Sequence, residues 1–381
     1  MKICIISSTR ADFGLLKNLI LQCKKKKIDY KFIVLGSHFS KYYGSTIKEI
    51  NENKIKIYKK VYNKINTSNE LGISQIVGKC VVSMTKILKK MSPDILVVLG
   101  DRYEILSCTL SAHICRIPVA HIHGGEVTHG VIDDAFRHSI TKMSQIHFVA
   151  NEVYKKRVIQ LGENPNTVFN VGGLGVDSIK NTKFLTRHEL EKKFKINFLK
   201  KNILISFHPE TLNKGSANEQ ISEILDALKK FKETCLIFTM PGAETENKII
   251  IKKVMSFVKK NKNAHFYKSL GQKNYFSFLK IVDLVLGNSS SGLLEVPTMK
   301  KATINLGNRQ SGRLESSSVI SIKIDKRLII KEIKRIYQKK FQKKLSFSKN
   351  PYGNGGSSLK ILNILKKTKF KNLINKKFYD I

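Results

Sequence analysis

The sequence predicts an α/β protein that contains two doubly wound domains. Apolar runs typical of buried parallel strands alternate with helical patterns, and this alternation pauses after residue 171 and restarts at residue 202. The length of 381 residues is too great for one compact core and favours two domains. Polar residues cluster directly after several apolar runs, which is where open α/β sheets bind their ligands.

The first half of the chain shows six strand-like runs with helical patterns between them. The expected strands are Ile3–Ser7, Tyr30–Leu35, Asp94–Leu99, Pro118–His121, Ile146–Val149 and Val168–Val171. The expected helices are Ala11–Lys26, Glu70–Met91, Tyr103–Cys115, Asp134–Met143 and Glu152–Leu161. A hinge is expected at Gly172–Gly175 and in the polar stretch that runs to about Lys200.

The second half repeats the pattern, with no internal repeat of 20–50 residues. The expected strands are Asn202–Phe207, Cys235–Met240, Ala264–Tyr267, Leu284–Gly287 and Ala302–Leu306. The expected helices are Glu219–Lys232, Glu244–Lys260, Lys273–Lys280 and Ser291–Val296, with a final helix from about Ser358. We expect an N-terminal domain over residues 1–178, a C-terminal domain over 179–350, and a last segment over 351–381.

Composition disfavours membrane, secreted and metal-binding proteins. No run of about eighteen apolar residues is present, so no transmembrane helix is expected. Residues Met1–Ile6 resemble a first strand rather than a signal peptide, which predicts a cytoplasmic protein. The six cysteines are scattered without a C-x-x-C pair, so we expect reduced core thiols and no zinc site.

The net charge of +40 raises the question of nucleic-acid binding. The basic runs, Lys24–Lys27 and the lysine-rich tail after Lys326, contain no interleaved aromatic residues and no known nucleic-acid motif. We therefore expect solvated lysine faces and no nucleic-acid partner. The charge still creates a field that attracts an anionic ligand, such as a nucleoside diphosphate.

An acid–base site is predicted near the end of the Asp94–Leu99 strand. The segments Gly100–Glu104, His121–Glu126 and Asp133–His138 place carboxylates, two arginines and three histidines within 40 residues. Two of these segments follow apolar runs, so their side chains are expected at the carboxyl edge of the sheet.

The loop after the first strand, Ser7–Gly14, lacks the G-x-G-x-x-G pattern, which disfavours a dinucleotide-binding dehydrogenase. Arg10, beside a helix N-terminus, suits a phosphate, although a surface arginine in a loop is equally ordinary.

A second anion site is expected after the Leu284–Gly287 strand. Ser289, Ser290 and Ser291 open a helix whose free N–H groups can hold a diphosphate, and Glu295 can accept hydrogen bonds from ribose hydroxyls. The alternative is an ordinary serine N-cap.

Three further residues support an anion site. Arg309 and Arg313 follow the next strand and add two guanidinium groups. His208 ends another strand, where it can contact a phosphate, transfer protons or be structural.

Taken together, these motifs resemble the hydrolysing UDP-N-acetylglucosamine 2-epimerases of bacterial sialic-acid biosynthesis and their relatives in legionaminic-acid synthesis. The matching segments occur in order at Ser8–Gly14, Leu99–Leu106, His121–Glu126, Ile132–Ser144, Tyr154–Glu163, Phe207–Thr211, Gly287–Pro297, Gly307–Arg313 and Asn350–Tyr352. The resemblance implies a GT-B fold, with two Rossmann-like domains, the active site between them, and a C-terminal helix that crosses back. It also implies elimination of UDP followed by hydration of 2-acetamidoglucal to N-acetylmannosamine.

The same resemblance suggests roles for individual residues. Asp101, Glu126 and Asp133 become candidate proton carriers, without a distinction between base and acid. Arg137, one helical turn after Asp133, would hold that carboxylate or a phosphate. His208 would contact the departing phosphate.

The remaining implied roles concern binding. Arg10, Ser290 and Glu295 would bind the nucleotide, and His123 and Asp134 are secondary candidates. The reaction includes no hydride transfer, so no cofactor is expected, and no metal site is expected either.

Alternatives remain open. UDP-N-acetylglucosamine is favoured over a UDP- or GDP-linked N,N'-diacetylbacillosamine, although the motifs are common to both branches. A GT-B glycosyltransferase would share the fold and nucleotide site but needs an acceptor, and a nucleotide-sensing protein is suggested by charge alone. We expect no membrane partner and a homo-oligomer, a dimer or tetramer.

Overall fold

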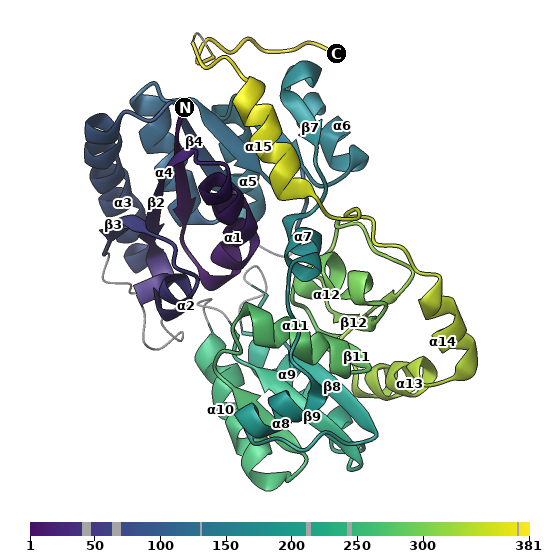
Figure 1. Cartoon of the computed structure of the whole chain (residues 1–381). Helices are drawn as coiled ribbons and strands as arrows, with labels where there is room; N and C mark the ends of the chain where they lie inside the picture. Colours follow the sequence, from purple (N-terminus) through teal and green to yellow (C-terminus); the bar gives the residue numbers. More distant parts are fainter. Residues whose placement is uncertain (40–46, 63–69, 130–131, 211–214, 242–245, 372) are drawn as a thin grey trace. The chain divides into compact units, whose positions relative to one another are not determined.

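The computed structural model describes residues 1–39, 47–62, 70–129, 132–210, 215–241, 246–371 and 373–381. They form two compact units (Figure 1). Unit 1 contains residues 1–127, 132–181 and 352–381, and unit 2 contains residues 128–131 and 182–351. The chain therefore leaves unit 1 after Asn181 and returns to it at Tyr352.

Unit 1 is built on a seven-stranded sheet in which every neighbouring pair is parallel, in the order β3-β2-β1-β4-β5-β6-β7. Its strands are β1 (Lys2–Ser7), β2 (Asp29–Leu35), β3 (Ile57–Val61), β4 (Ile95–Leu99), β5 (Val119–Ile122), β6 (Ile146–Val149) and β7 (Val168–Asn170). Its helices are α1 (Arg10–Lys25), α2 (Ile47–Glu52), α3 (Glu70–Met91), α4 (Tyr103–Ile114), α5 (Asp133–Met143), α6 (Glu152–Gln160), α7 (Leu174–Lys180) and α15 (Ser357–Lys367). Strand order reverses direction between β1 and β4, where doubly wound sheets form ligand crevices.

Helices cover both faces of the unit 1 sheet because successive strand residues point to opposite sides. Ile3 and Ile5 of β1 pack in one core with residues of α1 and α15. Cys4 and Ile6 pack in a second core with residues of α3 and α4. Five of the six cysteines are buried and the sixth, Cys115, is half-buried.

Unit 2 repeats the design with a six-stranded parallel sheet in the order β10-β9-β8-β11-β12-β13. Its strands are β8 (Lys201–Ser206), β9 (Thr234–Thr239), β10 (Ala264–Tyr267), β11 (Leu284–Gly287), β12 (Ala302–Leu306) and β13 (Val319–Ile322). Its helices are α8 (Arg187–Phe194), α9 (Ala217–Leu228), α10 (Asn247–Lys260), α11 (Gln272–Ile281), α12 (Ser291–Leu294), α13 (Lys326–Ile336) and α14 (Lys339–Ser346). The predicted α/β class, with two parallel-sheet domains, is confirmed.

Several elements differ from the sequence-based expectation. The edge strands β3 and β13 were not expected: two exposed lysines interrupt β3, whereas β13 is half-buried and largely apolar. Helices α7 and α8 occupy the stretch expected to be a hinge. The helix expected over Ser291–Val296 ends at Leu294, and a 3₁₀ turn with Pro297 follows, because proline cannot donate the next helical hydrogen bond. The expected start of a helix at Glu244 lies outside the described residues.

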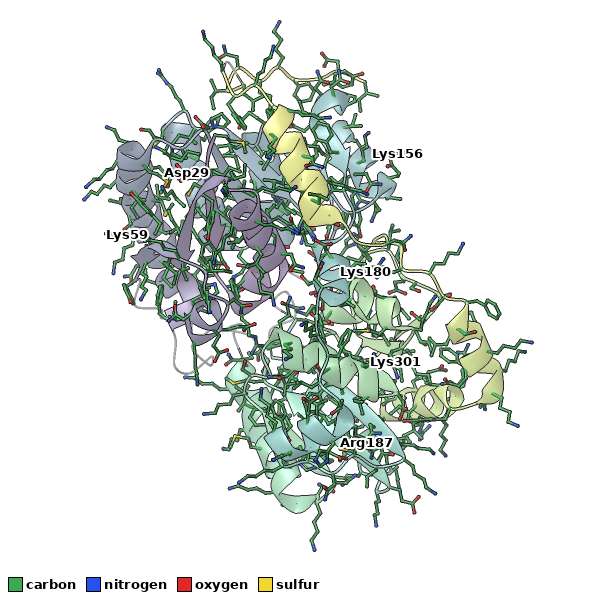
Figure 2. The ribbon with its side chains drawn as sticks, in the orientation of Figure 1. Asp29, Lys59, Lys156, Lys180, Arg187 and Lys301 are labelled. Atoms are coloured by element: carbon green, nitrogen blue, oxygen red, sulfur yellow. The ribbon has the colours of Figure 1, made fainter. Side chains whose placement is uncertain are left out.

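The lysine-rich stretch after residue 326 contains a core helix. In α13, Ile329, Ile333 and Ile336 are buried at helical spacing while the lysines between them remain outside. Exposed basic side chains project outward from both units, among them Lys59, Lys156 and Arg187 (Figure 2).

Among the described residues, one helix, α3, is long and apolar enough to span a membrane by length and composition. Its residues Ile76, Cys80, Met84 and Leu88 recur every four positions and are buried in unit 1. This spacing is typical of a helix that packs one face against a protein core. Such a core helix can meet the same length and composition criteria as a membrane-spanning helix.

Candidate functional site

Arg137 lies at the centre of the polar cluster in unit 1. Its side chain is 1% exposed and projects from α5. One guanidinium nitrogen, Nη1, donates to the Glu126 carbonyl at 2.9 Å and to Asp134 Oδ1 at 2.8 Å, and Nη2 pairs with the Asp101 carboxylate. This single buried cation therefore links α5 to the loops that follow β4 and β5.

His121 supports the same cluster from the middle of the sheet. Its Nε2 lies 2.8 Å from the Gly100 carbonyl, and its Nδ1 lies 3.1 Å from Thr141 Oγ1 on α5. Burial lowers the pKa of His121 to about 3, so the ring is neutral near pH 7. Gly100 immediately precedes Asp101. The contact of His121 with the Gly100 carbonyl therefore helps to fix the main-chain position of Asp101.

His123 has the features of a ligand-binding group. Its backbone φ is +67°, a conformation that non-glycine residues seldom adopt and that concentrates at functional sites. Its side chain is 8% exposed, with Nδ1 2.9 Å from Glu126 Oε1, and Nε2 is buried without a hydrogen-bond partner among the described residues. The ring can therefore accept or donate one further hydrogen bond.

Gly125 allows the loop after His123 to pack against α6. Gly125 has a φ of +75°, and a β-carbon there would collide with the Tyr154 carbonyl. Arg157 Nη1 donates to the Gly125 carbonyl at 2.6 Å. The loop that carries Glu126 is consequently held in place by main-chain contacts as well as by Arg137.

Arg102 and Glu104 belong to the cluster although the sequence analysis assigned them no role. Arg102 lies at the N-cap of α4, with Nε 3.0 Å from Glu104 Oε2, and Glu104 is 2% exposed. Burial acts to lower the pKa of Arg102, but the charges of Glu104 and Asp133 outweigh it and raise the pKa well above its ordinary value. Their presence within the G-D-R-Y-E motif was the available signal.

The loop after β1 forms a capping box at the start of α1. Thr9 Oγ1 accepts from the Asp12 N–H at 3.2 Å, and the Asp12 carboxylate accepts from the N–H groups of Ser8 and Thr9. Arg10 is the first residue of α1 and is half-buried. The capping box fixes the loop from which the Arg10 side chain extends.

Asn288 organises the strand ends of unit 2. It is fully buried, its Oδ1 accepts from the His208 N–H at 2.7 Å, and its Nδ2 donates to the His208 carbonyl at 2.8 Å. Its own carbonyl accepts from Gln310 Nε2 at 2.9 Å and from Arg309 Nη1 at 3.2 Å. The loops after β8, β11 and β12 therefore meet at one residue, through the side-chain amide of Asn288 on one side and its main-chain carbonyl on the other.

The three serines begin α12. Ser291 Oγ accepts from the Tyr275 hydroxyl at 2.8 Å and donates to Glu295 Oε2 at 2.5 Å. Ser290 lies at the N-cap but its side chain makes no capping hydrogen bond, which disfavours the ordinary N-cap alternative for this residue. Ser289 and Ser290 are half-buried.

The loop after β12 adds the two predicted arginines. Arg313 Nη1 donates to Gln310 Oε1 at 2.6 Å, so Gln310 connects Arg313 to Asn288. Glu210 is buried and accepts from the Asn308 N–H at 2.7 Å. Asn288, Gln310 and Glu210 were missed as contributors because their role depends on contacts across about 20 to 100 residues of sequence.

The predicted site residues thus fall into two groups, one in each unit. Unit 1 holds Arg10, Asp101, His123, Glu126, Asp133 and Arg137, and unit 2 holds His208, Ser289, Ser290, Ser291, Glu295, Arg309 and Arg313. In the described parts of the chain, no group of three or more His, Cys, Asp or Glu side chains is arranged to hold a metal ion.

Comparisons with known proteins place the chain in a family. The family model described as UDP-N-acetylglucosamine 2-epimerase matches residues 21–366. The chain is 39% identical over its whole length to the polysialic acid biosynthesis protein P7 of Escherichia coli, of which it covers 97%. It is also 39% identical to the GDP/UDP-N,N'-diacetylbacillosamine 2-epimerase (hydrolyzing) of Campylobacter jejuni, with 85% of each chain covered.

Solved structures agree on the fold. A UDP-GlcNAc 2-epimerase from Neisseria meningitidis, bound to UDP-GlcNAc, matches with a TM-score of 0.83 at 21% identity, covering 97% of this chain and 100% of that one. The GT-B-like fold class expected from the motifs is confirmed. Because the family model covers most of the chain and the motifs agree with it, this protein belongs to the UDP-N-acetylglucosamine 2-epimerase family.

Proposed function

We propose that the protein is a cytoplasmic hydrolysing 2-epimerase that converts UDP-N-acetylglucosamine and water to N-acetylmannosamine and UDP, for sialic-acid biosynthesis. The observation that carries this proposal is the cluster around Arg137, in which one buried cation arranges Asp101, Asp134 and the main chain of Glu126. Several carboxylates fixed at one strand edge suit a reaction that both removes and returns a proton.

In the first step, a carboxylate removes the C2 proton. The C2–H electrons form the C1=C2 double bond while the C1–O bond breaks, so its electron pair leaves with UDP. Asp101, Glu126 and Asp133 are the proposed proton carriers. His123 supports this assignment for Glu126, since its Nδ1 lies 2.9 Å from Glu126 Oε1 and its buried Nε2 can bind the sugar next to that carboxylate.

In the second step, water adds to C1 of 2-acetamidoglucal and a proton is delivered to C2 from the opposite face. The product is the free sugar with inverted C2. A separate acid and base are needed for this step, which explains why the site contains more carboxylates than a simple hydrolase requires.

The unit 2 residues are proposed to hold the departing diphosphate and its nucleoside. Ser289, Ser290 and the N–H groups at the start of α12 suit phosphate oxygens, and Arg309 and Arg313 supply positive charge. His208 contacts the phosphate that leaves. Arg10 is a further proposed nucleotide-binding residue.

Two further roles complete this binding scheme. Glu295 accepts hydrogen bonds from the ribose hydroxyls. The hydrogen bond from Ser291 Oγ to Glu295 Oε2 orients the carboxylate for this role. Ser291 therefore acts mainly by orienting Glu295.

A second substrate is favoured by the relatives. Two of them, from Campylobacter jejuni and Legionella pneumophila, are diacetylbacillosamine 2-epimerases (hydrolyzing), at 39% and 30% identity. The same reaction on UDP- or GDP-linked N,N'-diacetylbacillosamine would supply legionaminic acid. Incubation of the purified protein with each sugar nucleotide, with released nucleotide measured, identifies the substrate by its kcat/KM.

The reaction class is tested in isotopic water. Turnover in D₂O should place deuterium at C2 of the product, and turnover in H₂¹⁸O should label C1, because the C1–O bond breaks. Epimerised product with only protium at C2 would overturn the elimination mechanism. Release of free sugar and UDP without an acceptor would also exclude a glycosyltransferase.

A further inference from the structure

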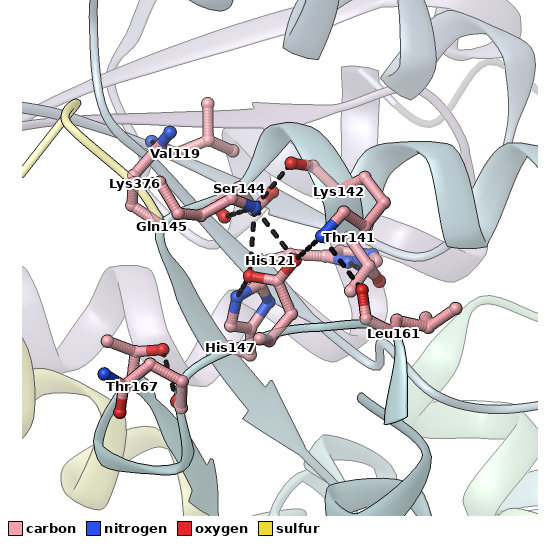
Figure 3. A network of polar contacts seen from close by, with 12 residues as sticks. Val119, His121, Thr141, Lys142, Ser144, Gln145, His147, Leu161, Thr167 and Lys376 are labelled. Carbon is pink, nitrogen blue, oxygen red and sulfur yellow. Dashed lines mark hydrogen bonds and ion pairs between the residues drawn. The ribbon is translucent and has the colours of Figure 1, made fainter. Parts of the chain in front are cut away.

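The chain end beyond α15 is fastened to unit 1 by one lysine. Lys376 Nζ donates to the carbonyls of Lys142 at 2.5 Å and Ser144 at 2.9 Å, and to both oxygens of Glu163 at 2.9 Å (Figure 3). Lys142 is in the last turn of α5, and Ser144 is its C-cap. A residue more than 230 positions away therefore satisfies carbonyls that the end of a helix leaves without a partner.

Glu163 connects Lys376 to two further side chains, Lys142 and His147. Its carboxylate is fully buried and also lies 2.8 Å from Lys142 Nζ and 2.9 Å from His147 Nε2. Burial acts to raise the pKa of Glu163, but the contacts with His147 and the two lysines outweigh it and lower the pKa. Removing one lysine from such a network leaves a buried charge with fewer partners, which is costly.

Two neighbouring residues in the chain end strengthen the attachment. The Phe378 ring lies against Gly162, where a β-carbon would collide with it, and Lys142 Nζ lies 4.7 Å from the ring centre. The Tyr379 N–H donates to the Gly162 carbonyl at 3.0 Å. We call residues Lys376–Tyr379 the terminal clasp.

The terminal clasp is connected to the proposed proton carriers through α5. The opposite end of this 11-residue helix carries Asp133, and Arg137 lies one turn further on. Thr141, adjacent to Lys142, contacts the His121 ring, which in turn contacts the Gly100 carbonyl next to Asp101. A shift of α5 would thus move Arg137 and the Asp101 loop together.

We propose that Lys376 is a positioning residue for the reaction, which acts by holding α5 and therefore Arg137 in place. This inference rests on the proposed function. Displacement of reacting groups by about 1 Å can cost on the order of 10²-fold in rate. Lys376→Met should lower kcat by about ten- to a hundredfold while UDP affinity stays within about twofold, because the nucleotide residues of unit 2 are untouched.

The matched control is Lys377→Met, which removes an exposed lysine from the adjacent position. It should retain wild-type kcat, and Lys376→Arg should recover part of the lost activity because it keeps the charge. Amide hydrogen exchange should become faster in α5 of Lys376→Met and remain unchanged in the control. Phe378→Ala, which loosens the terminal clasp without leaving a buried charge, should show a smaller loss of kcat.

Wild-type kcat in Lys376→Met would overturn the proposal, and so would equal losses of kcat in Lys376→Met and Lys377→Met. A third contradicting result is a kcat of Lys376→Met that equals the wild-type value when both are measured well below the unfolding midpoint of the variant, because the loss would then reflect unfolding alone. If Lys376→Met does not fold, Phe378→Ala decides, and unchanged kcat together with unchanged α5 exchange contradicts the proposal. Failure of the wild-type protein to act on either sugar nucleotide would instead contradict the proposed function.

Discussion

The two units place different chemistry at the same edge of similar sheets. At the strand ends of unit 1, the buried groups include charged ones, with Arg137 and Glu126 each 1% exposed and Glu104 2% exposed. In unit 2, neutral groups carry more of the corresponding loops, chiefly the Asn288 and Gln310 amides and the serine hydroxyls, beside one buried carboxylate, Glu210. Burying a charge costs free energy, and buried charged groups concentrate at catalytic sites that transfer protons. Neutral hydrogen-bond donors instead suit an anion that must bind and then dissociate. The comparison predicts that chemistry and binding separate by unit.

The largest effect is expected for the unit 1 carboxylates. Asp101→Asn, Glu126→Gln and Asp133→Asn should each lower kcat by about 10²–10⁴-fold, since proton transfer by a positioned group contributes that much. UDP affinity measured by calorimetry should largely survive. Asp29→Asn, a change of an exposed carboxylate paired with Lys31, is the control and should keep its activity. Near-normal turnover in any of the three would remove that residue from the proposed mechanism.

Asn288→Ala should disturb unit 2 more than any hydroxyl change. It removes two hydrogen bonds to the His208 main chain in a fully buried position, and each buried group left unsatisfied costs about 1–3 kcal/mol. UDP affinity should fall about tenfold or more, and the free energy of unfolding should drop by a few kcal/mol by the same principle. Calorimetry and urea denaturation measure the two effects, and unchanged values for both would show that Asn288 does not organise these loops.

Ser290→Ala and Glu295→Ala should have a moderate effect that is confined to binding. Each loses about one hydrogen bond to the nucleotide, which corresponds to a several-fold weaker UDP affinity, while kcat changes less. Ser317→Ala, which alters an exposed serine of the same unit, should leave the affinity unchanged. Unchanged UDP affinity in both site variants would contradict the assignment of the α12 loop and weaken the contrast between the units.

The smallest effect at neutral pH concerns the pH dependence of stability. Burial lowers the pKa of His121 to about 3 and that of His38 to about 4, and both belong to unit 1. The unfolded chain therefore binds more protons than the folded one between these values and about 6.5, so stability is full above pH 6.5 and is lost as pH falls. Each histidine contributes a slope of up to about 1.4 kcal/mol per pH unit. Denaturant titrations from pH 7 to 5 should show a shallower slope in His121→Asn, and an unchanged slope would refute this account.

The sequence predicts the central strands of both sheets well because these strands are covered on both faces and are therefore almost wholly apolar. The edge strand β3 escapes prediction because its exposed lysines interrupt the apolar signal on which strand assignment depends. β13 carries that signal at Val319, Ile320 and Ile322 and could have been recognised. Helix α13 was hidden because its three lysines and two arginines alternate with the isoleucines that face the core.

The candidate site shows the same division. Residues within the motifs, such as Asp101 and Ser290, could be named from the sequence, and their roles stay predictions. Arg137, which organises the unit 1 cluster, could also be named, but Asn288 and Lys376 could not. The contact of Lys376 with Glu163 joins segments 213 positions apart, and that of Asn288 with His208 joins segments 80 apart. Such pairs are determined by packing, for which local patterns carry no information.

The path of the chain has a consequence for how the protein is made. Unit 2 consists almost entirely of one continuous segment, 182–351, whereas unit 1 is completed by residues 352–381. Ile361, Leu362 and Leu365 of α15 belong to the unit 1 core, together with residues of β1 and α1 that leave the ribosome more than 300 residues earlier. A nascent chain emerges at about 5–20 residues per second, so unit 2 has all of its residues available before unit 1 can close. The apolar surface of α1 that α15 covers therefore stays uncovered until all of unit 2 has been synthesised.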